Sequence, residues 1–514
     1  SDTIDAIANQ DENGPPAYSS SNPFEAPDLT ASRGTQQVRG IAVNALATHQ
    51  TTNVVANIAG GLYAGVAATA SVSIIGGETS AKVTDSVLNG GDNSGASSAQ
   101  AVSVRAADHS YGTTFIGSGA FGAAGVGLSA DVNVFERNTI AGVQDVSRLD
   151  ARGATEVSAL SEQGVASVVV GASGGAVAVV GSGSVAKFTS TTEAYVRNSM
   201  LDVGSLDVDA AHGSTFFVTG GGLAVGGVGV AGTFAVALDT STTTAEVSDS
   251  GIDATGAVDV NASSATDIGA WSLGGAGGGA AGVAGAVTLG IVDSTTAASV
   301  VDSRIGSVND RAGSLSVTAS DHVTAEARAG AGAVGGIAGV GAGASVLKVD
   351  NSTTATVQDS DAHVAGAITV SALAERDLDN VAAAAAAGGT VGIGGAAAVT
   401  LLNAGMTDDA SGELDNTEGD NEGTLSSAQS FSNGQRLSSS GSGANIKATS
   451  AFTEDDIARI NGRSTVAAKD RVNAGPDGAT RAQVIDTAST AANTLRAGGN
   501  IEVSARENDA ISVK

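Results

Sequence analysis

Short runs in which apolar and polar residues alternate recur along the chain, and one of them has a nearly constant form. It reads apolar-x-Val-x-Ala, as in residues 206–210 and 368–372. Alternation with a period of two is the signature of a half-buried β-strand. Because the run returns about every 52 residues, the sequence predicts a repetitive β-protein. The central valines of the run are Val43, Val104, Val157, Val208, Val260, Val317, Val370 and Val503.

Two further blocks keep step with this strand motif. A run rich in Gly, Ala and Val follows it, as in residues 220–232 and 274–285, and a second strand of the form Ala/Thr-x-Val-x-Asp/Asn-Ser closes the unit. Gly, Asn and Asp-Ser between apolar runs favour turns. Small residues fill a core only where two sheets approach closely, so the Gly/Ala runs predict narrow, stacked sheets. Residues 36–403 contain no proline, which suits a continuous stack of paired strands.

These blocks predict an all-β fold, a repetitive parallel β-solenoid (β-helix) with units of about 52 residues and one insertion. Coils of known repeats take about 20–30 residues. We therefore expect two or three coils in each unit, and the three blocks favour three. Like residues then stack at about 4.8 Å along the axis, giving Val, Thr and Asn/Asp ladders. Another stacked or sandwich β architecture is the alternative.

The chain divides into four segments. Residues 1–35 are proline-rich and predict a connector, and residues 36–403 hold the solenoid repeats. Residues 404–480 are an acidic, Ser/Gly-rich insertion, in which Thr453 to Asp456 predict the start of a short helix that ends near Asn461. Such an insertion is either a tolerated surface loop or the place of a specific contact. Residues 481–514 resume the repeat and form the final unit, with an open edge.

Composition limits the functions that this fold can serve. The 24 Lys+Arg and 53 Asp+Glu residues give a net charge of −29, which disfavours nucleic acid and anionic membranes as partners. The chain has no cysteine, so disulfides and thiolate metal sites are excluded. The uncharged runs 164–186 and 214–238 are long enough for membrane helices. Their glycines disfavour a helix. An aromatic content of 3% cannot build the aromatic girdles of an outer-membrane barrel, so no membrane span is expected.

One acidic position recurs at the end of the second strand motif. Carboxylates suit hard cations, so this position is a candidate for weak Ca²⁺ sites. The other interpretation is that Asp-Ser ends the strand through side-chain to backbone bonds. Asn198, which occupies the position in one unit, keeps that turn role without the charge and favours the second interpretation. The acidic residues are Asp85, Asp145, Asp249, Asp302, Asp359 and Asp486.

No catalytic or cofactor-binding residue is predicted, and calcium is the one cofactor considered. Four histidines follow a central valine by four to six residues: His49, His109, His212 and His322. If a unit contains two or three coils, equivalent positions lie about 10–15 Å apart, too far for one metal ion to bridge. We therefore expect exposed turn residues. No unit concentrates carboxylates in a groove as a β-helix glycosidase or lyase does, so an enzyme is not expected.

The xVxA strands, the Gly/Ala-rich runs and the STTAxVxDS strands resemble the repeat regions of large bacterial filamentous adhesins. The haemagglutinin-like and leukotoxin-type adhesins are the nearest, and residues 241–262 and 352–372 match this style best. The resemblance implies an exported β-helical protein at the bacterial cell surface, which acts by adhesion or as a stalk.

The open edge of the last unit adds an expectation about partners. Open solenoid ends are strand edges that pair readily. We therefore expect copies to join head to tail into an extracellular filament, with a surface glycan or matrix as a further partner. The alternatives are a polysaccharide-active β-helix enzyme and a Ca²⁺-stiffened passive stalk of a surface protein.

Overall fold

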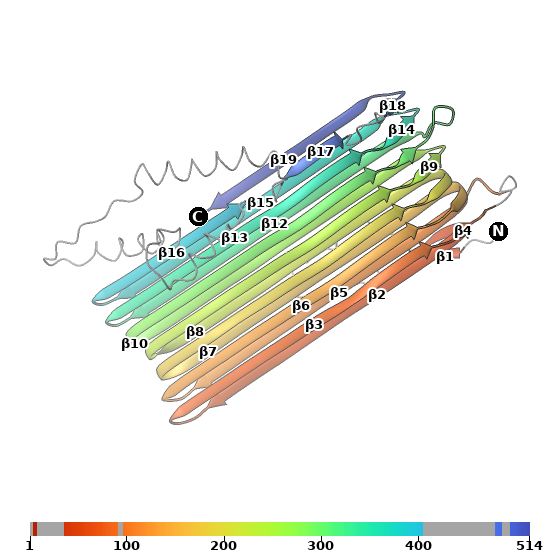
Figure 1. The fold of residues 1–514 in the computed structure, drawn as a ribbon. Helices are drawn as coiled ribbons and strands as arrows, with labels where there is room; N and C mark the ends of the chain where they lie inside the picture. Colours follow the sequence, from red (N-terminus) through yellow and green to blue (C-terminus); the bar gives the residue numbers. More distant parts are fainter. Residues whose placement is uncertain (1–3, 8–34, 91–95, 404–478, 486–493) are drawn as a thin grey trace, which may run out of the picture.

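The computed structural model describes residues 4–7, 35–90, 96–403, 479–485 and 494–514. In this part of the chain every regular element is a β-strand, and no helix is long and apolar enough to cross a membrane. Apart from β1 (Ile4–Ile7), which runs antiparallel to the start of the next strand, the strands pair in parallel and wind round one axis (Figure 1). The prediction of a parallel β-solenoid is confirmed.

Each coil contains two long strands that meet at a glycine-rich tip. In β10 (Ala257–Val301) the chain runs out to Gly278 and returns from Ala281, all within one element. β7 (Arg148–Arg197) and β8 (Met200–Ser248) also continue through the tip. In the other coils the two strands are separate: β2 (Thr35–Gly60) and β3 (Ala64–Thr84), β5 (Gln100–Phe121) and β6 (Ala124–Gln144), β12 (Ser314–Gly335) and β13 (Ala338–Gln358), β15 (Ile368–Gly388) and β16 (Val391–Leu402).

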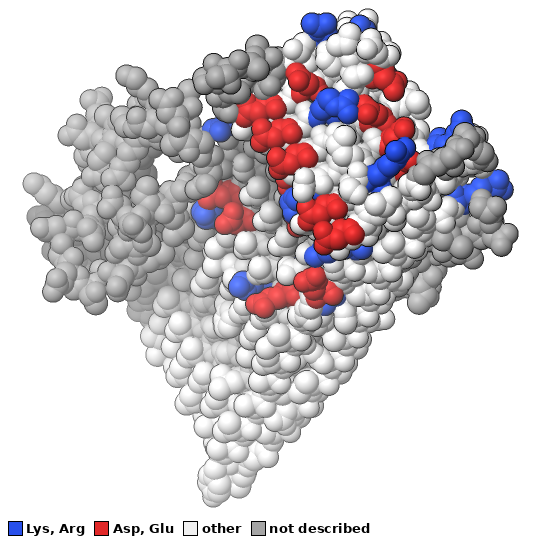
Figure 2. Space-filling view, turned by 45° about the vertical axis from the view of Figure 1, so that its right-hand side comes forward, with Lys and Arg blue, Asp and Glu red and all other residues white. Residues whose placement is uncertain are grey.

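A short third side closes each coil at the edge opposite the tip. The cross-section is therefore a wedge, broad at this side and narrow at the tip (Figure 2). In the last coil β17 (Thr480–Ile485) and β19 (Ile501–Val513) continue the long sides. The short side contains β4 (Val87–Leu88), β9 (Gly251–Ala254), β11 (Arg304–Ile305), β14 (Asp361–Val364) and β18 (Leu495–Ala497).

One sequence unit forms one coil, so the expectation of two or three coils was wrong. The central valines of successive units are direct partners across the sheet: Val208 pairs with Val260, and Val370 pairs with Val503. Known solenoid coils are short because their sides are short. Here β12 and β13 have 22 and 21 residues, so one coil absorbs the whole unit.

The register continues across the predicted insertion. Leu402 pairs with Val349, and Thr480 pairs with Thr353 of the same preceding coil. In the preceding coil, only three residues separate these two partners. Most of the predicted connector and of the insertion, with its short helix, lies outside the described residues, and so does Asp486.

The core changes composition from the broad side to the tip. Val, Ile and Leu fill the broad side, Phe135, Phe188 and Phe216 stack in the middle, and alanines line the narrow end. Near the tip the opposing backbones touch. A Cβ on Gly220 would lie 2.3 Å from the carbonyl oxygen of Phe234. The Gly/Ala runs therefore let the two sheets approach closely, as the sequence predicted.

Candidate functional site

The recurrent acidic residue sits at the turn between the second long strand and the short side. Asp and Asn tolerate positive φ better than other non-glycine residues. The N–H of Asp302 donates to the carbonyl oxygen of Gln358 in the next coil at 3.1 Å, and the other turns repeat this bond. The turn residues with φ between 46° and 54° are Asp85, Asp145, Asn198, Asp249, Asp302 and Asp359.

The serine after this turn residue is buried and joins neighbouring coils. Ser250 donates its hydroxyl to the carbonyl oxygen of Ser248 at 2.7 Å and accepts the backbone N–H of Ser199 at 3.1 Å. Ser303 donates in the same way to Val301 at 2.7 Å and accepts the N–H of Ser250 at 3.2 Å. The predicted side-chain to backbone bonding of the Asp-Ser pair is thus present, and it also links coils along the axis.

The side chains of these turns form a column with one strand spacing, about 4.8 Å, between neighbours, in which Asn198 stands in place of a carboxylate. Asp145 accepts hydrogen bonds from the amides of Gln144 at 3.0 Å and Asn198 at 2.6 Å. Among the described residues, no group of three or more His, Cys, Asp or Glu is arranged to hold a metal ion. Calcium binding by this column stays a prediction.

The histidines lie in strands, so the expectation of exposed turn residues was wrong. His109 in β5 is buried, and its Nδ1 contacts a carboxylate oxygen of Glu162 in the next coil. His322 in β12 is exposed and lies 3.6 Å from Glu375 of the next coil. Because one unit is one coil, equivalent positions are about 4.8 Å apart rather than 10–15 Å. His109 and His322 therefore contact the next coil directly.

A layer of buried polar side chains runs along the axis between the Val-rich broad side and the Phe-rich middle. Its most regular column is a threonine ladder, in which each residue pairs with the equivalent threonine of the next coil. Ladders of like residues, threonine among them, were expected from the sequence. The ladder consists of Thr79, Thr139, Thr192, Thr243, Thr296, Thr353 and Thr480.

Burial shifts the pKa values of three titratable groups in this layer towards the neutral forms. Asp239 accepts hydrogen bonds from Ser214 at 2.9 Å and Thr266 at 2.8 Å, yet desolvation dominates and raises the pKa of Asp239 to about 6. Desolvation also raises the pKa of Asp321. His212 is buried 3.2 Å from the hydroxyl of Ser190, and desolvation lowers its pKa to about 4.

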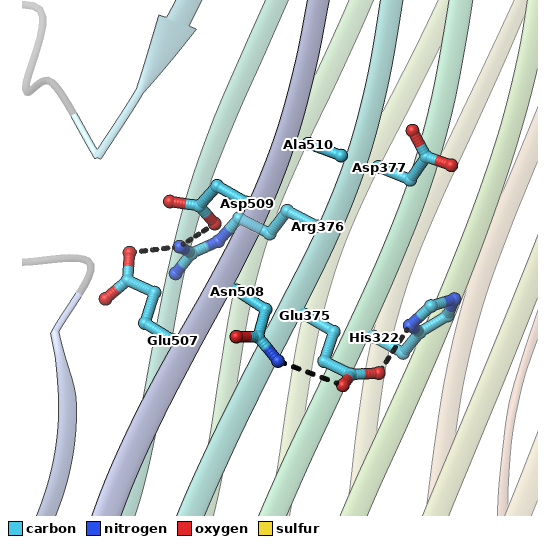
Figure 3. A pocket seen from close by; sticks show the side chains of 8 residues that line it. All are labelled: His322, Glu375, Arg376, Asp377, Glu507, Asn508, Asp509 and Ala510. Carbon is cyan, nitrogen blue, oxygen red and sulfur yellow. Dashed lines mark hydrogen bonds and ion pairs between the residues drawn. The ribbon is translucent and has the colours of Figure 1, made fainter.

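An open groove of about 400 Å³ lies where the polar layer reaches the last described strand (Figure 3). Strands β12, β15 and β19 each contribute to its wall. The residues that line it are His322, Glu375, Arg376, Asp377, Glu507, Asn508, Asp509 and Ala510.

Two sets of polar groups in the groove contact one another across the coils. Glu375 lies beside His322 and accepts a hydrogen bond from the amide of Asn508 at 3.3 Å, so this row crosses three coils. The buried Arg376 donates through Nη1 to Glu507 and, at 2.9 Å, to Asp509. Catalytic carboxylates or nucleophiles need a partner that activates them for a substrate. Here the partners tie β15 to β19.

The narrow half of the wedge carries no charged side chain, a feature that sequence analysis missed. Figure 2 shows Asp, Glu, Lys and Arg on the broad half and none towards the tip. The signal was present in the uncharged runs, which were weighed only as membrane spans. We call this half the apolar edge; it comprises residues 50–77, 110–130, 163–186, 213–238, 268–292, 329–347 and 380–403.

Comparison with family models, curated proteins and solved structures gives no match to this chain.

Proposed function

We propose that this chain is a structural segment of an extracellular fibre or adhesin, which extends by the end-to-end addition of coils. The observation that carries the proposal is the register. β10 pairs with β12 and β13 at every position from 257 to 278 and from 281 to 301. Ladders along the axis join all coils, and one Val-rich core runs from Ala81 to Ala372. Such a stack is suited to act as a stiff rod.

The strand edges at the two ends supply the chemistry for extension. β3 pairs with β6 on one side, and β19 pairs with β15. A free strand edge binds a matching strand. In the fibre, a further coil from the same chain or from another copy covers the groove around Arg376. Val503, which continues the buried valine ladder but is 46% exposed, is then buried as its counterparts are.

The placement outside the cell, the bacterial surface and a glycan or matrix partner rest on the resemblance to filamentous adhesins. The high net negative charge and the lack of cysteine are compatible with that placement. The location and the binding partner therefore rest on the resemblance, whereas end-to-end addition rests on the register of the strands.

Negative-stain microscopy of the purified full chain tests end-to-end addition. We expect filaments longer than one molecule, whose length increases with protein concentration. Val503→Asp should abolish them, because it places a charge where the next coil packs. Val308→Asp is the matched control, since Val308 is 58% exposed in a loop on the broad side. Short, isolated rods of the unmodified chain at every concentration would contradict the proposal.

A further inference from the structure

The apolar edge exposes large apolar side chains on both of its outer faces. In β10, Leu273 faces outward from the outgoing strand and is 57% exposed, and Val287 faces outward from the returning strand and is 50% exposed. In the neighbouring coil β8 repeats this with Leu223 on the outgoing strand and Phe234 on the returning strand, which are 53% and 41% exposed, and the tip adds Ile337 at 59%. Soluble proteins rarely expose a contiguous apolar surface of more than a few hundred Å² without a partner.

The backbone of the apolar edge is saturated with hydrogen bonds. The long strands pair with both neighbouring coils, and the tip turns are paired as well. Gly336 donates to the carbonyl oxygen of Gly278 at 3.0 Å, Ile337 to that of Ala280 at 2.9 Å, and Thr390 to that of Ile337 at 3.0 Å. Peptide groups enter a hydrocarbon phase only when they are bonded internally. Between the end coils, this edge meets that requirement.

An aromatic residue marks where the charged half begins. Trp271, the only tryptophan of the chain, pairs across the sheet with Arg328, whose guanidinium lies 5.4 Å from the indole centroid. Two residues further towards the tip is Leu273. Tryptophan is enriched at the boundary between water and hydrocarbon. From Trp271 to Gly279 the strand spans about 26 Å at about 3.3 Å per residue, close to the hydrocarbon thickness of about 30 Å.

We propose that the apolar edge inserts into the hydrocarbon of a zwitterionic lipid layer while the broad, charged half stays in water. A lipid phase is favoured over a second copy because both faces and the tip are apolar together. A copy packed on one face would leave the other face and the tip in water. The net charge of −29 disfavours anionic lipids, so the lipid is neutral overall.

Two measurements on the full chain test this inference. In density-gradient flotation with phosphatidylcholine vesicles, we expect the protein to float with the lipid. In the second, vesicles that contain dibrominated phosphatidylcholine should quench Trp271 fluorescence at least twofold, because bromine quenches only on contact. Protein that stays at the bottom of the gradient and is not quenched overturns the proposal.

Matched variants separate insertion from other causes of binding. Leu273→Glu combined with Val283→Glu places one charge on each face of the edge and should lower the floated fraction at least tenfold. Val308→Glu, an equally exposed valine on the broad half, should float as the unmodified chain does. Circular dichroism checks that each variant is folded, and the quenching of the unmodified chain needs no variant.

Sedimentation velocity without lipid distinguishes the rival occupant. Association that the double variant abolishes, together with a lack of flotation, would assign the edge to a second copy and overturn lipid insertion. Val503→Asp should float normally, because it changes only the axial end. Microscopy therefore reports a failure of fibre growth, and flotation independently reports a failure of lipid binding.

Discussion

The broad and narrow halves of the wedge build the same parallel sheet with opposite placements of large side chains. In the broad half Leu206 and Val208 point inward, and the alternating outward positions Asp207 and Asp209 are acidic. In the narrow half the inward residues are small, as at Ala224, and Leu223 points outward. The inward volume thus sets how far apart the two sheets lie, and the outward residues set what surroundings each half tolerates.

The largest expected effect contrasts two leucines of β8. Leu206→Ala, in the broad core at 1% exposure, should lower the free energy of unfolding by about 2–5 kcal/mol. Leu223→Ala, at 53% exposure, should change it by about 0.5 kcal/mol or less in water. Urea unfolding followed by circular dichroism measures both. Equal losses at the two sites would show that Leu223 is covered in solution.

The polar layer between the halves yields a prediction about pH. The pKa of Asp239 is raised from 3.8 to about 6, so its contribution to stability is present below pH 3.8 and is lost as pH rises through about 6. The pKa of His212 is lowered from 6.5 to about 4, so its contribution is present above pH 6.5 and is lost as pH falls through about 4. Each change amounts to about 3 kcal/mol, at about 1.4 kcal/mol per pKa unit.

Two single variants expose these opposite slopes. Asp239→Asn leaves His212 in place and should lose stability as pH falls from 6.5 towards 4. His212→Gln leaves Asp239 in place and should lose stability as pH rises through 6. The readout is the difference between the two curves of unfolding free energy against pH, because other carboxylates contribute equally to both. Parallel curves would mean that water reaches both groups.

The approach of the sheets at the tip is tested by two glycines of β8. A Cβ on Gly220 would lie 2.3 Å from a backbone carbonyl oxygen of the opposite strand, whereas nothing lies within 4 Å of one on Gly232. Gly220→Ala should therefore cost about 1–3 kcal/mol. Gly232→Ala should be neutral or slightly stabilising, since glycine weakens a strand interior. A Gly220→Ala variant as stable as Gly232→Ala would mean that the sheets stand further apart.

Sequence periodicity predicted the sheet but not the size of its coil. The equivalence of Val208 and Val260 was readable because stacked positions select the same residue type in each unit. Val208 pairs directly with Val260 because the chain turns only once, at the tip, between the two long strands of a coil. The sequence does not mark this turn, because Gly278 at the tip is one of many glycines in its run. Long-range packing at the tip decides between one coil and three.

The candidate sites show the same limit. The turn at Asp302 was readable, because Asn in place of Asp in one unit keeps the turn role without the charge, whereas its left-handed backbone was not predicted. The burial of Asp239 and His212 was not, because inward and outward positions alternate and only the register between opposing strands tells which is which. To predict the apolar edge, one would have to know which residues of the strand face inward. Both the inward and the outward residues are apolar there, and only the inward ones are buried.

The smallest effect expected concerns the acidic column at the turns of the broad side. Asp302→Asn keeps a side chain that tolerates positive φ and removes one charge, so the melting temperature should move by no more than about 2 °C. Asp302→Ala removes that tolerance and should lower the free energy of unfolding by about 1 kcal/mol or more. If the column holds calcium, Asp302→Asn loses the stabilisation that calcium gives. Chelator then lowers the melting temperature of the unmodified chain but not of this variant. Differential scanning calorimetry with and without chelator decides whether the broad side is a turn column or a cation column.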